Sequence, residues 1–231
     1  MNTYKNIKVI AFDADDTLWV NETYFREAEH AFAKLLSKYE TENKIDQELF
    51  KIEIKNLSLY GYGVKGFVLS MLESALLLSN NQIDLEAISQ IITIGKEMLN
   101  KPVELLEGVV QVLEKVQSKY KIVLATKGDL LDQERKLEKS GLTKYFHHIE
   151  VLSEKKSENY IKMLSNLEIN PSEFLMVGNS LKSDILPLIE IGAKAIHVPF
   201  HTTWAHEMVA DTNQEKKYET VQKLTDILEI L

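Results

Sequence analysis

Five short, largely apolar runs constrain the fold of this chain more than any other feature of its sequence. Each is about the length of a strand and is bounded by polar or turn-forming residues, which is typical of strands buried on both faces of a parallel sheet. The runs are Val9–Phe12, Ile122–Ala125, Ile149–Leu152, Phe174–Val177 and Ala195–Val198.

From residue 108 onward these runs alternate with amphipathic stretches. Val109, Leu113 and Val116 recur at helical spacing, and so do Ile161 and Leu164 in a later stretch. Strand–helix alternation indicates a parallel sheet with helices on both faces. The sequence therefore predicts an α/β fold with a Rossmann-like core.

The stretch from about Asn21 to Pro102 breaks this alternation. It contains no convincing strand, and its apolar residues follow helical spacing. Further helices are expected at Leu57–Tyr62, Val68–Leu78 and Ile88–Leu99. We therefore expect a catalytic core made of residues 1–20 and 103–231, interrupted by a helical cap domain of residues 21–102 that acts as a lid.

Composition narrows the functional classes. The 231 residues carry a net charge of −8 and no dense basic cluster, which argues against a nucleic-acid partner. No cysteine is present, so disulfides, thiolate metal sites and cysteine nucleophiles are excluded. No apolar stretch is long enough to span a bilayer and no signal segment precedes the first run, so we expect a soluble cytoplasmic protein.

Reactive side chains follow four of the predicted strands. Because carboxyl ends of parallel strands meet at one edge of a sheet, we expect these groups to converge there. They are Asp13 and Asp15 after the first run, Thr126 after the second, Lys155 and Lys156 after the third, and Asn179 and Asp184 after the fourth.

These residue types suit phosphoryl transfer. A carboxylate can attack phosphorus, and a second carboxyl can protonate the leaving oxygen and then deprotonate water. A hydroxyl and an ammonium can hold the phosphoryl oxygens. Asp13 and Asp15 would repel each other and the substrate, so a hard divalent cation with oxygen ligands is expected, and magnesium suits this role.

The segments that carry these groups resemble the motifs of the haloacid dehalogenase-like (HAD) hydrolase superfamily. Its first motif, Asp-x-Asp-x-(Thr/Val), matches Asp13 to Thr17, and its second, an apolar strand ending in Thr or Ser, matches Thr126. The fourth, usually Gly-Asp-Ser-x-x-x-Asp-Ile, matches Gly178 to Ile185, with Asn179 where aspartate is usual. The motifs occur in the family's order and span essentially the whole chain.

The resemblance implies a role for each matching residue. Asp13 would be the nucleophile and a magnesium ligand, and Asp15 the general acid/base, with its backbone carbonyl on the metal. Thr126 and a lysine would bind phosphate, and Asn179 and Asp184 would complete the metal site. The family's dehalogenase and phosphonatase branches generally lack an acid at the position of Asp15, so the phosphatase branch is favoured.

Several assignments stay open at the level of sequence. The family's third motif is a lysine near the end of the third strand, and Lys155 is preferred over Lys156 for this position. Lys127 is a further candidate for binding substrate. His201, His206 and Glu207 cluster near Trp204, but their spacing matches no zinc signature and favours a surface loop.

The expected activity is hydrolysis of a small phosphorylated metabolite. The alternatives are a phosphomutase, which returns the phosphoryl group to its substrate, and a catalytically weak protein that binds phosphate ligands.

Overall fold

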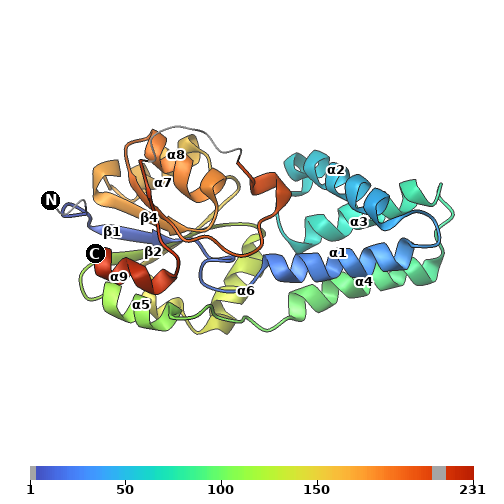
Figure 1. Ribbon diagram of the computed structural model, residues 1–231, viewed down its shortest axis with the longest axis horizontal. Helices are drawn as coiled ribbons and strands as arrows, with labels where there is room; N and C mark the ends of the chain where they lie inside the picture. Colours follow the sequence, from blue (N-terminus) through green and yellow to red (C-terminus); the bar gives the residue numbers. More distant parts are fainter. Residues whose placement is uncertain (1–3, 210–216) are drawn as a thin grey trace. The chain divides into compact units, whose positions relative to one another are not determined.

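A computed structural model describes residues 4–209 and 217–231 of the chain (Figure 1). The chain divides into two compact units. One comprises Met1–Glu22, Val103–Lys127 and Gln133–Leu231, and the other comprises Thr23–Pro102 and Gly128–Asp132. The short segment 128–132, which directly follows a core strand, groups with the helical unit, although the sequence assigned it to the core.

A parallel sheet forms the centre of the first unit. In the described part of the chain it has six strands in the order β3-β2-β1-β4-β5-β6. The central strand β1 pairs in parallel with β2 on one side and with β4 on the other. The strands are β1 (Val9–Phe12), β2 (Lys121–Lys127), β3 (His148–Leu152), β4 (Phe174–Gly178), β5 (Lys194–His197) and β6 (Glu219–Thr220).

Helices cover both faces of this sheet (Figure 1). Alternate residues of β1 point to opposite faces, so Ile10 and Phe12 enter one core and Val9 and Ala11 the other. The first core lies against α5 (Val109–Val116), α6 (Leu130–Ser140) and α9 (Ile227–Ile230). The second lies against α7 (Ser157–Asn166) and α8 (Leu186–Glu190). The expected Rossmann-like α/β architecture is confirmed.

The second unit is built from four helices: α1 (Glu22–Leu36), α2 (Glu42–Tyr60), α3 (Val64–Leu78) and α4 (Leu85–Asn100). Its own core includes Phe32, Leu49, Met71 and Ile91, all nearly inaccessible to solvent. Helices α3 and α4 approach closely at Gly95, where an added Cβ would lie 2.2 Å from Val68 Cγ2. A side chain at position 95 would therefore force Val68 or the helices themselves to shift.

Some elements differ from those expected. Helix α2 begins at Glu42, well before the predicted start at Leu57, and ends at Tyr60. Strand β6 was not predicted, because its two residues are both exposed and carry no apolar pattern. Short 3-10 helices cover Thr143–Tyr145, Pro171–Glu173, Ala205–Glu207 and Leu224–Asp226. Among the residues described, no helix combines the length and the apolar character needed to cross a lipid bilayer.

Candidate active site

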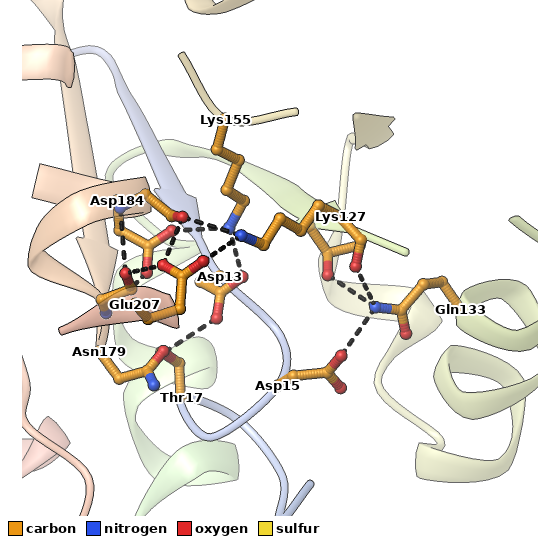
Figure 2. A network of polar contacts seen from close by, with 12 residues as sticks. Asp13, Asp15, Thr17, Lys127, Gln133, Lys155, Asn179, Asp184 and Glu207 are labelled. Atoms are coloured by element: carbon orange, nitrogen blue, oxygen red, sulfur yellow. Dashed lines mark hydrogen bonds and ion pairs between the residues drawn. The ribbon is translucent and has the colours of Figure 1, made fainter. Parts of the chain in front are cut away.

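The carboxyl edge of the sheet brings most of the predicted residues together (Figure 2). The order β3-β2-β1-β4 makes the four strands that carry them direct neighbours. Asp13 follows β1, Thr126 lies at the end of β2, Lys155 follows β3, and Asp184 lies just beyond β4. These four residues are buried, whereas Asp15, Lys127 and Asn179 are partly buried.

Asp13 and Asp184 are joined by one buried ammonium group. Lys155 Nζ donates to Asp13 Oδ1 and, at 2.6 Å, to Asp184 Oδ1. Only 3% of Lys155 is exposed, whereas the neighbouring Lys156 is exposed and precedes the first residue of α7. The structure therefore places Lys155, and not Lys156, in the site.

The ionisation of this cluster is governed by burial and by charge pairing. Burial and the nearby Asp184 carboxylate raise the pKa of Asp13 to about 7, against the opposing effect of Lys155. Burial alone would lower the pKa of Lys155, but the carboxylates of Asp13 and Asp184 hold that pKa well above its usual value. Lys155 is consequently a permanent cation at neutral pH, while Asp13 needs a further positive charge to be fully ionised.

The position of Asp184 depends on a glycine at the end of β4. A Cβ added at Gly178 would lie 2.4 Å from Asp184 Oδ2, which is closer than atoms can approach. Asp184 lies within a single π-helical turn, Leu181–Ile185, and its Oδ2 accepts a hydrogen bond from Ser180 N at 3.0 Å. π-helical turns are frequent at functional sites, and this one brings Asp184 back over the strand end.

Oxygen atoms converge around the side chain of Asn179. One terminal position of its amide lies 3.2 Å from the carbonyl oxygen of Asp15, from Thr17 Oγ1 and from Asp13 Oδ2. If the amide nitrogen of Asn179 occupies this position, it can donate hydrogen bonds to the three oxygens. If the amide oxygen occupies it, four oxygens lie close together. The first orientation satisfies these contacts without an ion. The carboxylate, carbonyl, hydroxyl and amide oxygens gathered here are nevertheless donors that suit a hard ion such as magnesium.

The described residues hold no cluster of three or more His, Cys, Asp or Glu side chains that could bind a metal. Any metal at Asn179 would therefore depend on neutral oxygens as well as carboxylates. Asp184, the remaining predicted ligand, has both of its oxygens engaged by Lys155 and Ser180. The assignment of Asp13, Asp15, Asn179 and Asp184 as metal ligands stays a prediction.

Asp15 points in a different direction from Asp13 (Figure 2). Its Oδ1 accepts hydrogen bonds from Trp19 Nε1 at 2.7 Å and from Lys136 Nζ at 2.6 Å. Its Oδ2 accepts one from Gln133 Nε2 at 2.9 Å. The two acids of the first motif therefore have separate surroundings, one a buried acid–lysine cluster and the other a set of hydrogen-bond donors.

The tight turn after β1 is stabilised by Asp16. This residue has a φ of 63°, and its carboxylate accepts hydrogen bonds from the backbone N–H groups of Asn21 and Glu22 at the start of α1. Burial raises the pKa of Asp16 to about 8, and the neighbouring Asp15 contributes. Asp16 thus orders the segment that carries both Asp13 and Asp15.

Lys127 is already paired within the protein. Its ammonium donates to Glu207 and, at 3.0 Å, to Ser183 Oγ. Glu207 also accepts hydrogen bonds from the hydroxyls of Ser180 and Ser183. Glu207 lies in the predicted surface loop, where His201 and Ala205 are exposed, but its own side chain turns inward and is only 10% exposed.

Glu207 is held in its ionised form. Burial alone would raise its pKa, but Lys127 and the two serine hydroxyls hold that pKa down at about 2. The carboxylate comes from a loop that follows β5, and it connects the end of β2 to the segment after β4. No sequence motif indicated this contact, because the pairing is purely tertiary.

Replacing Glu207 by glutamine should destabilise the protein by up to about 3 kcal/mol at pH 7, given a folded-state pKa near 2 and an ordinary value of 4.5. Because the pKa of Glu207 is lower in the folded state, the ionised carboxylate stabilises the fold above pH 4.5, and this stabilisation is lost as the pH falls toward 2. The free energies of unfolding in urea of the parent and of Glu207→Gln should therefore differ at pH 7 and become similar in acid.

Glu107→Gln, at an exposed position, is the control, and its free energy of unfolding should differ from that of the parent by less than about 0.5 kcal/mol. An equal loss in Glu207→Gln at both pH values would contradict the electrostatic account.

The sheet topology and the acid–lysine cluster at its carboxyl edge define a Rossmann-like α/β protein with a candidate active site at the strand ends. A family model described as haloacid dehalogenase-like hydrolase matches residues 7–192, and the chain belongs to this family. A search of curated proteins found no match.

Several solved structures superpose over nearly the whole chain. A haloacid dehalogenase-like family hydrolase from Xanthomonas campestris is 37% identical, with a TM-score of 0.87 over 97% of this chain and 92% of the other. The putative HAD-hydrolase YfnB from Bacillus subtilis, bound to magnesium, is 17% identical, with a TM-score of 0.65 over 98% and 99%. L-2-haloacid dehalogenase from Xanthobacter autotrophicus is 16% identical, with a TM-score of 0.69 over 97% and 98%. The last two show likeness of fold alone.

Proposed function

We propose that this hydrolase is a magnesium-dependent phosphatase that cleaves a small phosphate monoester through an aspartyl-phosphate on Asp13. The observation that carries the proposal is the pair of first-motif acids in separate surroundings. Asp13 is buried beside Lys155, whereas Asp15 is held by donors on the other side of the strand end. Two carboxyls in different surroundings can divide the roles of nucleophile and general acid/base.

Each step of the reaction uses a residue of this site. The Asp13 carboxylate attacks phosphorus while the ammonium of Lys155 and the hydroxyl of Thr126 hold the phosphoryl oxygens. Thr126 Oγ1 accepts a hydrogen bond from Gln133 Nε2 at 2.9 Å, which leaves its own hydrogen to donate to phosphate. Asp15 enters the reaction in its protonated form and gives that proton to the leaving oxygen. The carboxylate that this leaves, which Trp19, Lys136 and Gln133 stabilise, then takes a proton from the water that hydrolyses the intermediate and so regenerates the acid.

Magnesium would be held by Asp13, the carbonyl oxygen of Asp15, Asn179 and Asp184. When bound, it shields the negative charge of nucleophile and substrate and polarises the phosphoryl group. Support comes from the convergence of oxygens at Asn179, and the fold relative from Bacillus subtilis is described as bound to magnesium. A positive charge beside Asp13 would also lower the pKa of that residue and so favour its ionised, nucleophilic form.

EDTA should abolish phosphate release, and added magnesium should restore it. Because the pKa of Asp13 without metal is about 7, protons compete with the cation, and the apparent magnesium affinity should fall as the pH drops below 7. Asn179→Asp adds a negative charge to the donor set and should tighten magnesium binding, by about tenfold. Titration calorimetry of parent and variant at pH 6 and pH 8 measures both effects. Activity that survives EDTA, or an affinity that does not change with the variant, would contradict these expectations.

The alternative of a haloacid dehalogenase is supported by fold relatives that are described as dehalogenases, among them proteins from Xanthobacter autotrophicus and Pseudomonas syringae. Against it stands Asp15, an acid that the dehalogenase branch generally lacks. The test is direct: purified protein is given a panel of phosphorylated metabolites and of 2-haloacids, and phosphate and halide release are measured. Phosphate release without halide release supports the phosphatase, and the reverse result overturns it.

The same assay separates the remaining alternatives. A phosphomutase would transfer the phosphoryl group back to its substrate and release little phosphate, so an isomerised phosphoester would accumulate. A protein that only binds phosphate ligands would show saturable binding and no turnover. The intact pair of Asp13 and Asp15 supports the hydrolase.

A further inference from the structure

The carboxylate of Asp15 is surrounded by hydrogen-bond donors that no sequence motif indicated. Three side chains donate to it: Trp19 and Lys136 to Oδ1, at 2.7 and 2.6 Å, and Gln133 to Oδ2, at 2.9 Å. Trp19 belongs to the same turn as Asp15 and is almost fully buried. The other two donors come from a distant part of the sequence.

Gln133 and Lys136 both project from α6, one helical turn apart. Positions three apart on a helix lie on the same face, so one helix face delivers an amide and an ammonium to the same carboxylate. Lys136 Nζ also donates to Asn21 Oδ1 at 3.2 Å, and its side chain is only 19% exposed. The cation is therefore fixed between two acceptors and does not swing freely in solvent.

Gln133 has further contacts that reach the phosphate-binding side of the site (Figure 2). Its Nε2 lies 2.9 Å from Thr126 Oγ1 and 2.9 Å from the carbonyl oxygen of Lys127. The same amide nitrogen is thus within hydrogen-bond distance of Asp15, of Thr126 and of the Lys127 carbonyl at the end of β2. The residue is 3% exposed, so water has almost no access to it.

The other end of the same amide has no partner. Among the described residues, Gln133 Oε1 is a buried oxygen without a hydrogen bond. A buried acceptor is rarely left unpaired, and such exceptions call for a functional explanation. Here the amide keeps its nitrogen toward Asp15 and Thr126 although this orientation leaves its oxygen unsatisfied.

We infer that Gln133 and Lys136 are positioning residues for the general acid/base. Lys136 fixes the direction of the Asp15 carboxylate, and Gln133 ties that carboxylate to Thr126, so that proton transfer and phosphate binding keep a fixed relation. This inference rests on the proposed phosphatase function. On this account two residues of α6, Gln133 and Lys136, belong to the catalytic arrangement, and both lie in the unit that contains the sheet.

The inference predicts an effect that depends on the leaving group. The kcat/KM value reports the steps up to departure of the leaving group, and p-nitrophenolate leaves without being protonated, whereas an alkoxide needs the acid. Gln133→Met and Lys136→Met should lower kcat/KM for an alkyl phosphate on the order of 10²-fold. For p-nitrophenyl phosphate the fall in kcat/KM should stay below about tenfold.

The two variants should differ in phosphate binding. Gln133 contacts Thr126 and Lys136 does not, so inhibition by inorganic phosphate should weaken in Gln133→Met and remain unchanged in Lys136→Met. Lys136→Arg keeps a cationic donor and should recover part of the lost rate on the alkyl ester. Lys139→Met removes an exposed lysine from the same helix and should leave both esters unaffected.

The experiment measures kcat/KM for both esters and inhibition by phosphate in the parent and these four variants, with thermal unfolding as a check of folding. Equal losses on the two esters, or no loss at all, would overturn the inference while leaving the phosphatase intact. Release of phosphate from neither ester by the parent would overturn the proposed function, and the inference with it. Lys136 is partly exposed and Lys136→Arg keeps the charge, so the Lys136 variants should fold. The comparison of leaving groups can then be made with them even if Gln133→Met does not fold.

Discussion

Replacing Asp13 by asparagine should reduce phosphate release by a factor on the order of 10⁴ or more, because the variant lacks the nucleophile. The amide is nearly isosteric with the carboxylate, and although the change removes one ion pair of Lys155, it also removes a charge that Asp184 repels and leaves Lys155 paired with Asp184. The fold and its thermal stability should therefore be retained. Steady-state phosphate release together with circular dichroism measures both parts of the prediction.

Beryllium trifluoride, which mimics a phosphorylated carboxylate, should bind the parent in the presence of magnesium and should not bind Asp13→Asn. Substantial phosphatase activity in a folded Asp13→Asn variant would exclude Asp13 as the nucleophile. An unfolded variant would leave the beryllium trifluoride result on the parent as the decisive observation.

Replacing Lys155 by methionine should produce the largest loss of stability of any single change at the site. Methionine fills a similar volume but leaves Asp13 and Asp184 buried together without their shared cation. Removing one partner from a buried ion pair typically costs about 3–5 kcal/mol. Urea unfolding at neutral pH, in the absence of magnesium, measures the loss.

The adjacent Lys156 supplies a matched control. It is exposed, so Lys156→Met should change the free energy of unfolding by less than about 0.5 kcal/mol. Magnesium should also stabilise Lys155→Met more than it stabilises the parent, because a cation near Asp13 replaces part of the lost charge. Equal stability of the Lys155→Met and Lys156→Met variants would contradict the account of the buried cluster.

Most of the core could be predicted because strand burial leaves a strong pattern. The apolar runs around β1, β2 and β4 are almost fully inaccessible to solvent, and their sequences show this directly. Helix α2 was harder, because its core positions Ile45, Leu49 and Ile52 are separated by charged residues that give the segment a polar appearance. The spacing of these three residues is helical and indicates that the helix begins well before Leu57.

Only those site residues that lie at or just after the end of a strand could be predicted from the sequence. Topology alone brings Asp13, Thr126 and Asp184 to one edge, so motifs in the right order were sufficient. The contacts of Glu207 and Gln133 depend on where a loop and a helix pack, which a single sequence does not specify. The position of Lys127 at the end of β2 could be predicted from the sequence, but not the carboxylate that pairs with it.

The most direct test of the central claim is to trap the phosphoryl-enzyme. The parent is mixed with magnesium and p-nitrophenyl phosphate that carries a labelled phosphoryl group, quenched in acid within the first turnover, and digested for peptide mapping. The account predicts label on the peptide that contains Asp13, at up to one phosphoryl group per chain, and no label in Asp13→Asn. Release of phosphate by the parent with no labelled Asp13 peptide, or with label on another residue, would contradict it.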